Sequence, residues 1–448
     1  MTHADLIIIG AGPGGYETAL HAAADGMKVV LFNGGQLGGT CLNAGCIPTK
    51  CMVKDAAVFD TLHNYEEWGL DNVSYDLNFN KVISRRDAVV GQLRTGIATL
   101  LQKAGVTMVE AKASFKDAHT VTADGQDYSA DNIIIATGSE SKSLPVPGAD
   151  QPWVLDSTKL LQLEYVPESL TIVGGGVIGL EFASVFASFG SKVTVIEFLK
   201  NIAPTFDADI SKRLKQALSK RGINILTGAA VKNLEQTSDY RIKATYECKG
   251  KEESIESSDL LMAVGRKPNI EGLNLEAAGV NYSPRGIAVD DNMRTNVEHI
   301  YAIGDVNARM MLAHVASYQG LRALNAICGK EDQIRFDVVP AALFTAPECA
   351  MAGLTEEQCK AAGRAVKIGK SFYRANGKAL AMGEPEGLCK LIFDAETDCL
   401  IGAHIMGADA ALLAQQCCDM ITANRTRTEI RETIFGHPTL SEVILAAL

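Results

Sequence analysis

The segment Asp5–Gly15, which reads DLIIIGAGPGG, decides the fold of the first part of the chain. Its apolar start is typical of a strand that is buried on both faces of a parallel sheet. Gly10, Gly12 and Gly15 then match the pattern G-x-G-x-x-G, and Tyr16–Asp25 predicts a helix. In this pattern the glycines make the turn, admit a pyrophosphate and let the helix pack on the strand. The segment therefore predicts a dinucleotide-binding unit.

A second copy of this unit begins at the predicted strand Ser169–Val173. Its glycines are Gly174, Gly176 and Gly179, and the next strand ends at Glu197. A carboxylate at that spacing accepts hydrogen bonds from ribose hydroxyls and repels a 2′-phosphate, and no arginine follows in residues 198–212. The second copy therefore predicts an NAD site rather than an NADP site. A duplicated nucleotide unit indicates an enzyme that carries electrons between two dinucleotides.

The first copy departs from this pattern at Asn33, where its second strand ends. A dinucleotide site usually places an acidic residue at this point. An amide can still accept one hydrogen bond from a ribose. We therefore expect Asn33 to bind the ribose of the first dinucleotide more weakly than a carboxylate would.

Length, charge and cysteine content exclude several classes of protein. The 448 residues predict three or more lobes, and the net charge of −11 argues against nucleic acid as a partner. No apolar run approaches the length of a membrane span. The first residues lead directly into a strand, so we expect no secretory signal. The eleven cysteines are scattered, as in a cytoplasmic protein with reduced thiols and one functional pair.

The segment Gly38–Lys50, GGTCLNAGCIPTK, contains that pair, Cys41 and Cys46. Pro48 suits the first turn of a helix that we expect to reach Thr61. Cys46 would then lie at the helix N-terminus, where the macrodipole favours a thiolate. This arrangement suits a reversible redox disulfide. The spacing alone leaves open a second interpretation, in which both cysteines are simply buried in a turn.

The wording of this segment resembles the active-site signature of the flavin-dependent pyridine nucleotide–disulfide oxidoreductases. Within that family it is most similar to the members that oxidise dihydrolipoyl groups. The resemblance implies an α/β fold with two Rossmann-like domains, for FAD and NAD, and a C-terminal α+β dimerisation domain. The implied limits are 1–145 for the first part of the FAD domain, 146–266 for the NAD domain, 267–338 for the second, central part of the FAD domain and 339–448 for the interface domain.

Further cofactor residues follow from the same resemblance. Asp305, in the strand-and-turn segment Ile300–Val306, is expected to bond the ribityl chain of FAD. Ala313 opens a helix, expected over residues 315–327, whose N-terminus would face the flavin ring. Lys50 would lie near the flavin and pair with Glu181. The remaining expected cofactor contacts are Thr40, Thr137, Gly138 and Gly265.

The last motif is HPTLSE, from His437 to Glu442. A histidine that a following carboxylate orients has the layout of a general base. The resemblance implies that this dyad reaches the disulfide of the other subunit in a homodimer. It also implies that Cys41 exchanges with substrate and that Cys46 lies next to the flavin. The expected catalytic residues are therefore Cys41, Cys46, His437 and Glu442, with no metal.

The expected reaction is NAD-dependent oxidation of a dihydrolipoyl group to lipoyl, on dihydrolipoamide or on a lipoyl-bearing protein. The partner would be the acyltransferase core of an oxoacid dehydrogenase complex or a glycine-cleavage system. Three alternatives stay open. A glutathione-reductase-like enzyme would need arginines after the NADP strand, and a mercuric-reductase-like enzyme would need a terminal cysteine pair, whereas Cys417 and Cys418 lie inside a predicted helix. The third alternative is a docking subunit whose flavin is structural.

The local patterns also predict regular elements outside the motifs. Phe79–Lys103 has helical spacing, Leu388–Asp394 alternates like a strand, and Ala410–Thr422 predicts a helix. Val106–Asp131 predicts short β hairpins with a turn at Asp124–Gly125.

Overall fold

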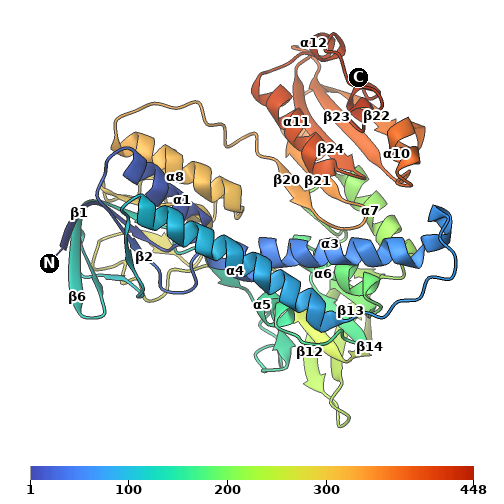
Figure 1. Ribbon diagram of the computed structural model, residues 1–448, viewed down its shortest axis with the longest axis horizontal. Helices are drawn as coiled ribbons and strands as arrows, with labels where there is room; N and C mark the ends of the chain where they lie inside the picture. The colour runs from blue at the N-terminus through green and yellow to red at the C-terminus, as the bar shows by residue number, and fades with distance from the viewer. Residues whose placement is uncertain (1) are drawn as a thin grey trace. The chain divides into compact units, whose positions relative to one another are not determined.

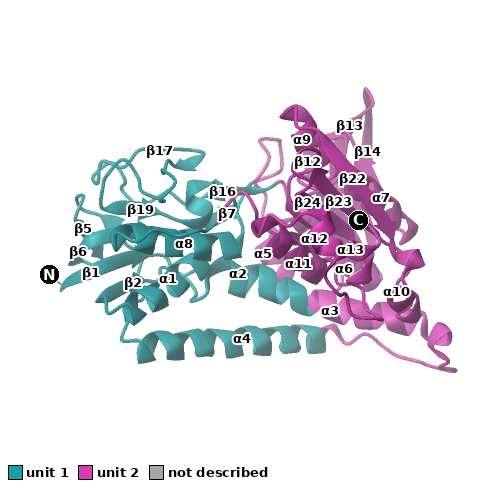
Figure 2. Cartoon of the chain, turned by 90° about the horizontal axis from the view of Figure 1, so that it is seen from above, with its two compact units in different colours: residues 1–51, 80–142, 265–334 teal, residues 52–79, 143–264, 335–448 magenta. Residues whose placement is uncertain are grey.

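The computed structural model describes residues 2–448 and divides into two units (Figures 1 and 2). Unit 1 consists of residues 1–51, 80–142 and 265–334, and unit 2 consists of residues 52–79, 143–264 and 335–448. Each unit is therefore assembled from three stretches of the chain. The four domain limits expected from the sequence stay a prediction.

Unit 1 is built on a seven-stranded sheet of order β3-β2-β1-β6-β5-β4, with β19 paired to β6. The parallel strands β3, β2, β1, β6 and β19 form the nucleotide-binding part. Strands β4 and β5 continue the sheet beyond β6 in antiparallel fashion. The strands span β1 (Thr2–Ile9), β2 (Val29–Phe32), β3 (Thr107–Val109), β4 (Ser114–Phe115), β5 (Thr120–Ala123), β6 (Gln126–Ile135) and β19 (Ile300–Ala302).

One part of the hairpin prediction for Val106–Asp131 is wrong. Its first strand, β3, follows the helix α4 (Phe79–Lys103) and pairs in parallel with β2. A strand that follows a crossover helix returns to the same sheet in parallel. The later hairpin is confirmed, because Ala123 pairs with Gln126 around the turn at Asp124 and Gly125.

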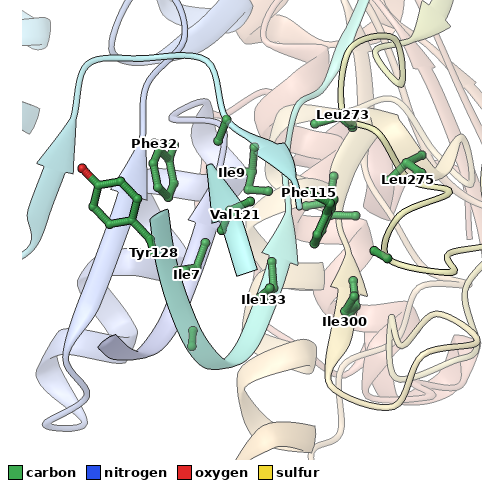
Figure 3. Close-up of a cluster of buried hydrophobic side chains, with 14 of the residues drawn as sticks. Ile7, Ile9, Phe32, Phe115, Val121, Tyr128, Ile133, Leu273, Leu275 and Ile300 are labelled. Carbon is green, nitrogen blue, oxygen red and sulfur yellow. The ribbon is translucent and has the colours of Figure 1, made fainter. Parts of the chain in front are cut away.

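The core of unit 1 lies between this sheet and the segment that follows β16 (Arg266–Pro268) (Figure 3). Ile7, Ile133 and Ile300 come from three neighbouring strands and are fully buried. Phe115 from β4 and Leu275 from the segment after β16 belong to the same cluster. Residues 265–334 therefore belong structurally to the first nucleotide unit, although residue 265 lies 130 positions after the end of β6 at Ile135.

Two helices of unit 1, α1 (Pro13–Ala24) and α8 (Ala313–Ile327), lie side by side in Figure 1. Their contact is close, because a Cβ on Gly14 would lie 3.1 Å from the Cβ of Ala316. The other elements of unit 1 are α2 (Gly39–Ala44), the start of α3 (Cys46–His63), η2 (Gly304–Asn307) and the short strands β7 (Ser139–Ser141), β16 (Arg266–Pro268), β17 (Tyr282–Ser283) and β18 (Gly286–Ile287).

Unit 2 repeats the parallel arrangement in a five-stranded sheet of order β11-β10-β9-β15-β8. The strands span β8 (Val154–Leu155), β9 (Ser169–Val173), β10 (Lys192–Glu197), β11 (Asn224–Thr227) and β15 (Asp259–Met262). Three strands form a second, antiparallel sheet, β12 (Ala229–Gln236), β13 (Ile242–Cys248) and β14 (Lys251–Ser257). The helices here are α5 (Ser157–Leu161), α6 (Val177–Ser188) and α7 (Ala208–Lys220), after the end of α3 and η1 (Tyr65–Trp68).

The C-terminal part of unit 2 is an antiparallel sheet of order β20-β21-β24-β23-β22. These strands span β20 (Ala341–Leu343), β21 (Cys349–Gly353), β22 (Val366–Phe372), β23 (Leu388–Asp394) and β24 (Leu400–Met406). The predicted strand at β23 and the helix α11 (Ala410–Thr422) are confirmed. The short elements are α9 (Glu356–Ala361), η3 (Tyr373–Ala375), α10 (Gly377–Ala381), α12 (Arg427–Arg431) and α13 (Glu442–Leu445).

A buried ion cluster joins strand β23 to the N-termini of helices α7 and α9 within unit 2. Lys390 lies in the middle of β23, and its side chain is only 1% exposed. Its Nζ donates to both oxygens of Asp207 at 2.9 Å, to Asp209 at 3.0 Å and to Glu356 at 2.6 Å. Burial lowers the pKa of Lys390, but the hydrogen bonds outweigh it and hold that pKa above its ordinary value. The ammonium is therefore charged and compensates Asp207, which caps α7 and is 0% exposed.

Among residues 2–448, no helix is both long enough and apolar enough to span a membrane.

Candidate functional site

The first glycine-rich turn closes on backbone rather than on side chains. Gly10 has a φ of +111°, and a Cβ there would lie 2.3 Å from the carbonyl oxygen of Ala136. A Cβ on Gly15 would lie 1.8 Å from the oxygen of Gly10. Gly12 caps α1, and its nearest contact for a Cβ is 3.9 Å away. The turn therefore leaves space at the start of α1, as a pyrophosphate bound to helix N–H groups requires.

The second turn has the same form. Gly174 has a φ of +114°, and its Cβ would lie 2.3 Å from the oxygen of Ala263. A Cβ on Gly179 would lie 2.1 Å from the oxygen of Gly174, whereas nothing lies within 4 Å of one on Gly176. Gly265 follows the end of strand β15 in the chain, has a φ of +109°, and likewise has nothing within 4 Å of an added Cβ.

Glu197 stands at the end of β10, as expected, and is only 8% exposed. One carboxylate oxygen accepts from the N–H of Gly175 at 2.5 Å, and the other accepts from that of Leu199 at 2.6 Å. These bonds hold the carboxylate beside the glycine turn and leave it further lone pairs for ribose hydroxyls. Glu197 is thus oriented before any nucleotide binds.

The cysteine segment begins directly on the first glycine turn. The N–H of Gly38 donates to the oxygen of Ala11 at 2.9 Å, and a Cβ on Gly39 would lie 2.7 Å from the Cα of Gly12. Thr40 and Cys41 lie on α2, and Cys46 is the first residue of α3. The expected position of Cys46 at a helix N-terminus is therefore confirmed, and the helix ends at His63 rather than Thr61.

The two cysteines are thiols in this structure, and their side chains hydrogen-bond to each other. This bond with Cys46, followed by burial, raises the pKa of the Cys41 thiol far above its ordinary value. The Lys50 ammonium opposes that shift only in part. In the reduced pair the Cys41 thiol therefore holds its proton, and Cys46 is the sulfur that lies at the positive end of α3.

Asn43, inside the cysteine segment, has a structural role that the sequence did not reveal. Its side-chain N–H groups donate to the oxygens of Gly39 at 2.8 Å and Leu37 at 3.0 Å. Arg94 of α4 donates in turn to the amide oxygen of Asn43 at 2.5 Å. The segment between the cysteines is thus held by Arg94, which lies 51 residues further along the chain. Nothing local in the sequence signals this partner.

Asp305 lies in η2, directly after β19. One of its oxygens accepts from the hydroxyl of Ser139, and Ser139 accepts from Arg266 Nε at 2.7 Å. The preceding Gly304 donates its N–H to Gln319 of α8 at 2.7 Å. These contacts orient the carboxylate at the sheet end, where the ribityl chain is expected. Ser139, Arg266 and Gln319 were not among the predicted residues.

The other expected cofactor residues of unit 1 lie at the same sheet end. The hydroxyl of Thr137 donates to the oxygen of Asn269 at 2.7 Å, and the N–H of Asn269 donates to the oxygen of Gly138 at 2.9 Å. Ala313 is the first residue of α8, so this helix begins two residues earlier than expected. Glu181, by contrast, belongs to unit 2, where it accepts from the N–H of Phe344 at 3.0 Å. Its ion pair with Lys50 stays a prediction.

His437 and Glu442 form the expected dyad. His437 Nδ1 lies 3.0 Å from Glu442 Oε1, and the other Glu442 oxygen accepts from the N–H of Thr439 at 2.9 Å. The Thr439 bond, and then the histidine, hold the pKa of Glu442 below its ordinary value. The carboxylate thus stays charged and fixes the Nδ1–H tautomer, which leaves Nε2 as the acceptor. The His437 side chain is 79% exposed, so its ring is accessible from outside its own unit.

Comparisons with known proteins show which family the chain belongs to. Residues 4–320 match the family model described as pyridine nucleotide-disulphide oxidoreductase, and residues 339–448 match the dimerisation domain of that family. The chain is 38% identical to a dihydrolipoyl dehydrogenase of Bacillus subtilis, over 99% of this chain and 97% of the relative. It is 40% identical to a dihydrolipoyl dehydrogenase of Staphylococcus aureus, over 99% and 95%.

A solved structure shows the same fold. The HOCl-induced flavoprotein disulfide reductase RclA of Escherichia coli superposes with a TM-score of 0.87 at 29% identity, over 98% of each chain. Proteins of this family are flavoproteins that use FAD and a pyridine nucleotide, and the open glycine turns, Asp305 and Glu197 fit these groups. The chain therefore belongs to the pyridine nucleotide–disulphide oxidoreductase family.

Proposed function

We propose that this protein oxidises a dihydrolipoyl group to its lipoyl disulfide and reduces NAD⁺ to NADH. In balance, the dithiol and NAD⁺ give the disulfide, NADH and one proton. The observation that carries the proposal is the hydrogen-bonded Cys41–Cys46 pair, whose segment is bonded to the first glycine turn. The names of the full-length relatives support the choice of substrate.

The thiol chemistry follows from the different protonation of the two cysteines. The pair reacts as a disulfide, and one substrate thiolate attacks the sulfur of Cys41. The Cys41–Cys46 bond breaks, and its electron pair stays on Cys46, at the N-terminus of α3. The second substrate thiol then attacks the substrate sulfur bound to Cys41, which closes the lipoyl disulfide. Cys41 leaves and takes the proton, as its raised pKa favours.

Bound FAD supplies the acceptor for the two electrons of the reduced pair, and NAD⁺ takes them up as hydride. Gly10, Gly12 and Gly15 would hold the FAD pyrophosphate, and Asp305 would accept from its ribityl hydroxyls. Gly174, Gly176 and Gly179 would hold NAD⁺, with Glu197 on its ribose. Glu197 favours NAD⁺ over NADP⁺, because a 2′-phosphate would be repelled by its carboxylate.

His437 accepts the proton of the attacking substrate thiol at Nε2, and Glu442 holds the ring and stabilises the imidazolium. The ring of His437 is largely exposed, so we assign its Nε2 to the disulfide of a second copy of the chain. The protein would then act as a homodimer through residues 339–448, which match the dimerisation domain. The physiological substrate would be a lipoyl group carried by an acyltransferase core or by a glycine-cleavage carrier protein.

The compartment we propose is the cytoplasm. Cys389, Cys417 and Cys418 are buried thiols in the core around the antiparallel sheet of unit 2, which is typical of a reducing environment. Cys417 and its neighbour Cys418 both lie within α11, so they are placed for packing rather than for binding mercury.

The test is NADH formation from dihydrolipoamide by the purified protein and three variants. Cys41→Ser and Cys46→Ser should each reduce turnover to background while retaining the yellow flavin. Cys328→Ser, which changes an exposed thiol remote from the pair in sequence, should keep wild-type turnover. Normal turnover by Cys41→Ser would contradict the proposal. Efficient NADPH-dependent reduction of glutathione disulfide by the wild type would favour the glutathione-reductase-like alternative.

A further inference from the structure

The two nucleotide units of this chain share a strand order but place their carboxylates differently. Unit 1 has β3-β2-β1-β6, and unit 2 has β11-β10-β9-β15. In each unit the chain leaves the glycine turn through a helix and returns on the next strand, β2 or β10. β10 ends at Glu197, whereas the strand end that corresponds to it in unit 1 carries Asn33.

A carboxylate nevertheless lies beside Asn33. The amide Nδ2 of Asn33 donates to Glu110 Oε2 at 2.7 Å. Glu110 directly follows β3, which is the neighbour of β2 in the sheet. Phe32 pairs with Val109 in the parallel register, so Asn33 and Glu110 are consecutive neighbours at the carboxyl edge.

The backbone fixes this arrangement. The N–H of Asn33 donates to the oxygen of Val109 at 2.8 Å, and Asn33 is only 6% exposed. One residue further on, a Cβ on Gly34 would lie 2.8 Å from Cγ and 3.2 Å from Cα of Lys112. The two strand exits therefore run in close contact. The Glu110 carboxylate cannot move far from the Asn33 amide without loss of the 2.7 Å bond.

Unit 2 has the reverse arrangement at the same two positions. Glu197 pairs with Thr227, so the middle strand carries the carboxylate and the outer strand carries a neutral side chain. In unit 1 the middle strand carries the neutral Asn33 and the outer strand carries Glu110. The carboxylate has thus moved by one strand along the same edge of the sheet.

We propose that Glu110 supplies the carboxylate that binds the adenosine ribose of FAD, with Asn33 as its positioning partner. Asn33 occupies one lone pair of one Glu110 oxygen, and the exposed carboxylate retains others for the 2′- and 3′-hydroxyls. The amide oxygen of Asn33 adds one more acceptor. This assignment revises the weak ribose recognition expected from Asn33 alone. It rests on FAD as the cofactor of the proposed function and is independent of the thiol substrate.

The experiment compares the binding of two flavins to apoprotein, by titration of flavin fluorescence. The first is FAD, and the second is the FAD analogue whose adenosine carries a 2′-deoxyribose. The wild type should prefer FAD by about tenfold or more, as expected for a hydrogen bond to a charged group. Glu110→Gln keeps an oxygen that accepts from Asn33 but removes the charge, and it should lose most of that preference.

Two further variants make the outcome decisive. Glu331→Gln, which changes an exposed carboxylate elsewhere in unit 1, should keep the full preference. The double variant Asn33→Glu with Glu110→Gln, which returns the carboxylate to β2, should regain it. An unchanged preference in Glu110→Gln would overturn the proposal, and so would an equal weakening of both flavins, which would indicate a structural role only. A wild type that binds neither flavin would instead refute FAD as the cofactor.

Discussion

The buried ammonium of Lys390 allows a stability prediction whose size follows from the structure. In Lys390→Met the side chain keeps a similar length, but Asp207 loses a partner that bonds both its oxygens at 2.9 Å. Asp207 is 0% exposed, so its charge has no access to water. The side chains of Asp209 and Glu356 are 38% and 46% exposed and remain hydrated. The cost therefore arises chiefly at Asp207, and breaking a buried pair in this way costs about 3–5 kcal/mol.

Urea unfolding followed by tryptophan fluorescence measures this cost in the relevant part of the chain, because both tryptophans, Trp68 and Trp153, belong to unit 2. Lys390→Met should lower the free energy of unfolding by about 3–5 kcal/mol. The double variant with Asp207→Asn should recover much of the loss, because no buried charge is then left unpaired. Lys367→Met breaks an exposed pair with Asp398 and should cost no more than about 1 kcal/mol. A cost for Lys390→Met as small as that of Lys367→Met would refute the reasoning.

Three further predictions concern the site and the acid limit of unit 2. Glu197→Gln should raise the KM for NAD⁺ about tenfold or more and reduce the preference over NADP⁺, as steady-state kinetics with both nucleotides would show; an unchanged preference would contradict the ribose assignment. His437→Gln should slow disulfide reduction by dihydrolipoamide by about 10² to 10⁴ in stopped-flow measurements, and a normal rate would exclude it as the base. Burial raises the pKa of Asp209, but hydrogen bonds from Lys370 and Lys390 outweigh burial and lower this pKa to about 2. The Asp209 carboxylate therefore stabilises the fold fully above its ordinary pKa, and this stabilisation is lost as the pH falls from about 4 to about 2. The difference in urea midpoint between wild type and Asp209→Asn should therefore shrink over that range, and a difference that grows would have the wrong sign.

The sequence was most informative where a short segment carries its own geometry. The strand, glycine turn and helix around Gly10 and Gly174 needed only local residues, and the structure has them where they were expected. The same is true of the His437–Glu442 dyad, whose partners are five residues apart. In such segments the chemistry and the spacing are read from one stretch of chain.

Contacts between distant segments could not be predicted in this way. Strand β3 looked like part of a hairpin, because its three residues carry no sign of the strand with which they pair. The prediction for Asn33 considered one strand end alone, and the carboxylate at Glu110 comes from 77 residues away. The segment around Lys390 predicts a strand, but nothing in it indicates the bond from Lys390 to Asp207, which lies 183 residues earlier. Register and sheet order decide these contacts, and both are properties of the folded chain.

The two glycine turns also indicate that the two nucleotide-binding units arose by duplication. A Cβ added to Gly10 would lie 2.3 Å from the carbonyl oxygen of Ala136, and one added to Gly174 would lie 2.3 Å from that of Ala263. A Cβ added to Gly15 or to Gly179 would collide with the carbonyl oxygen of the first glycine of the same turn. Where a side chain packs against another side chain, substitutions can change both partners, so the two halves of a duplication can diverge there. They cannot diverge where backbone meets backbone, because no substitution removes a carbonyl group. Saturation mutagenesis of this chain should therefore show two sets of positions that tolerate no substitution, with the same spacing in each set. These positions would identify the duplicated unit even where the rest of its sequence has diverged.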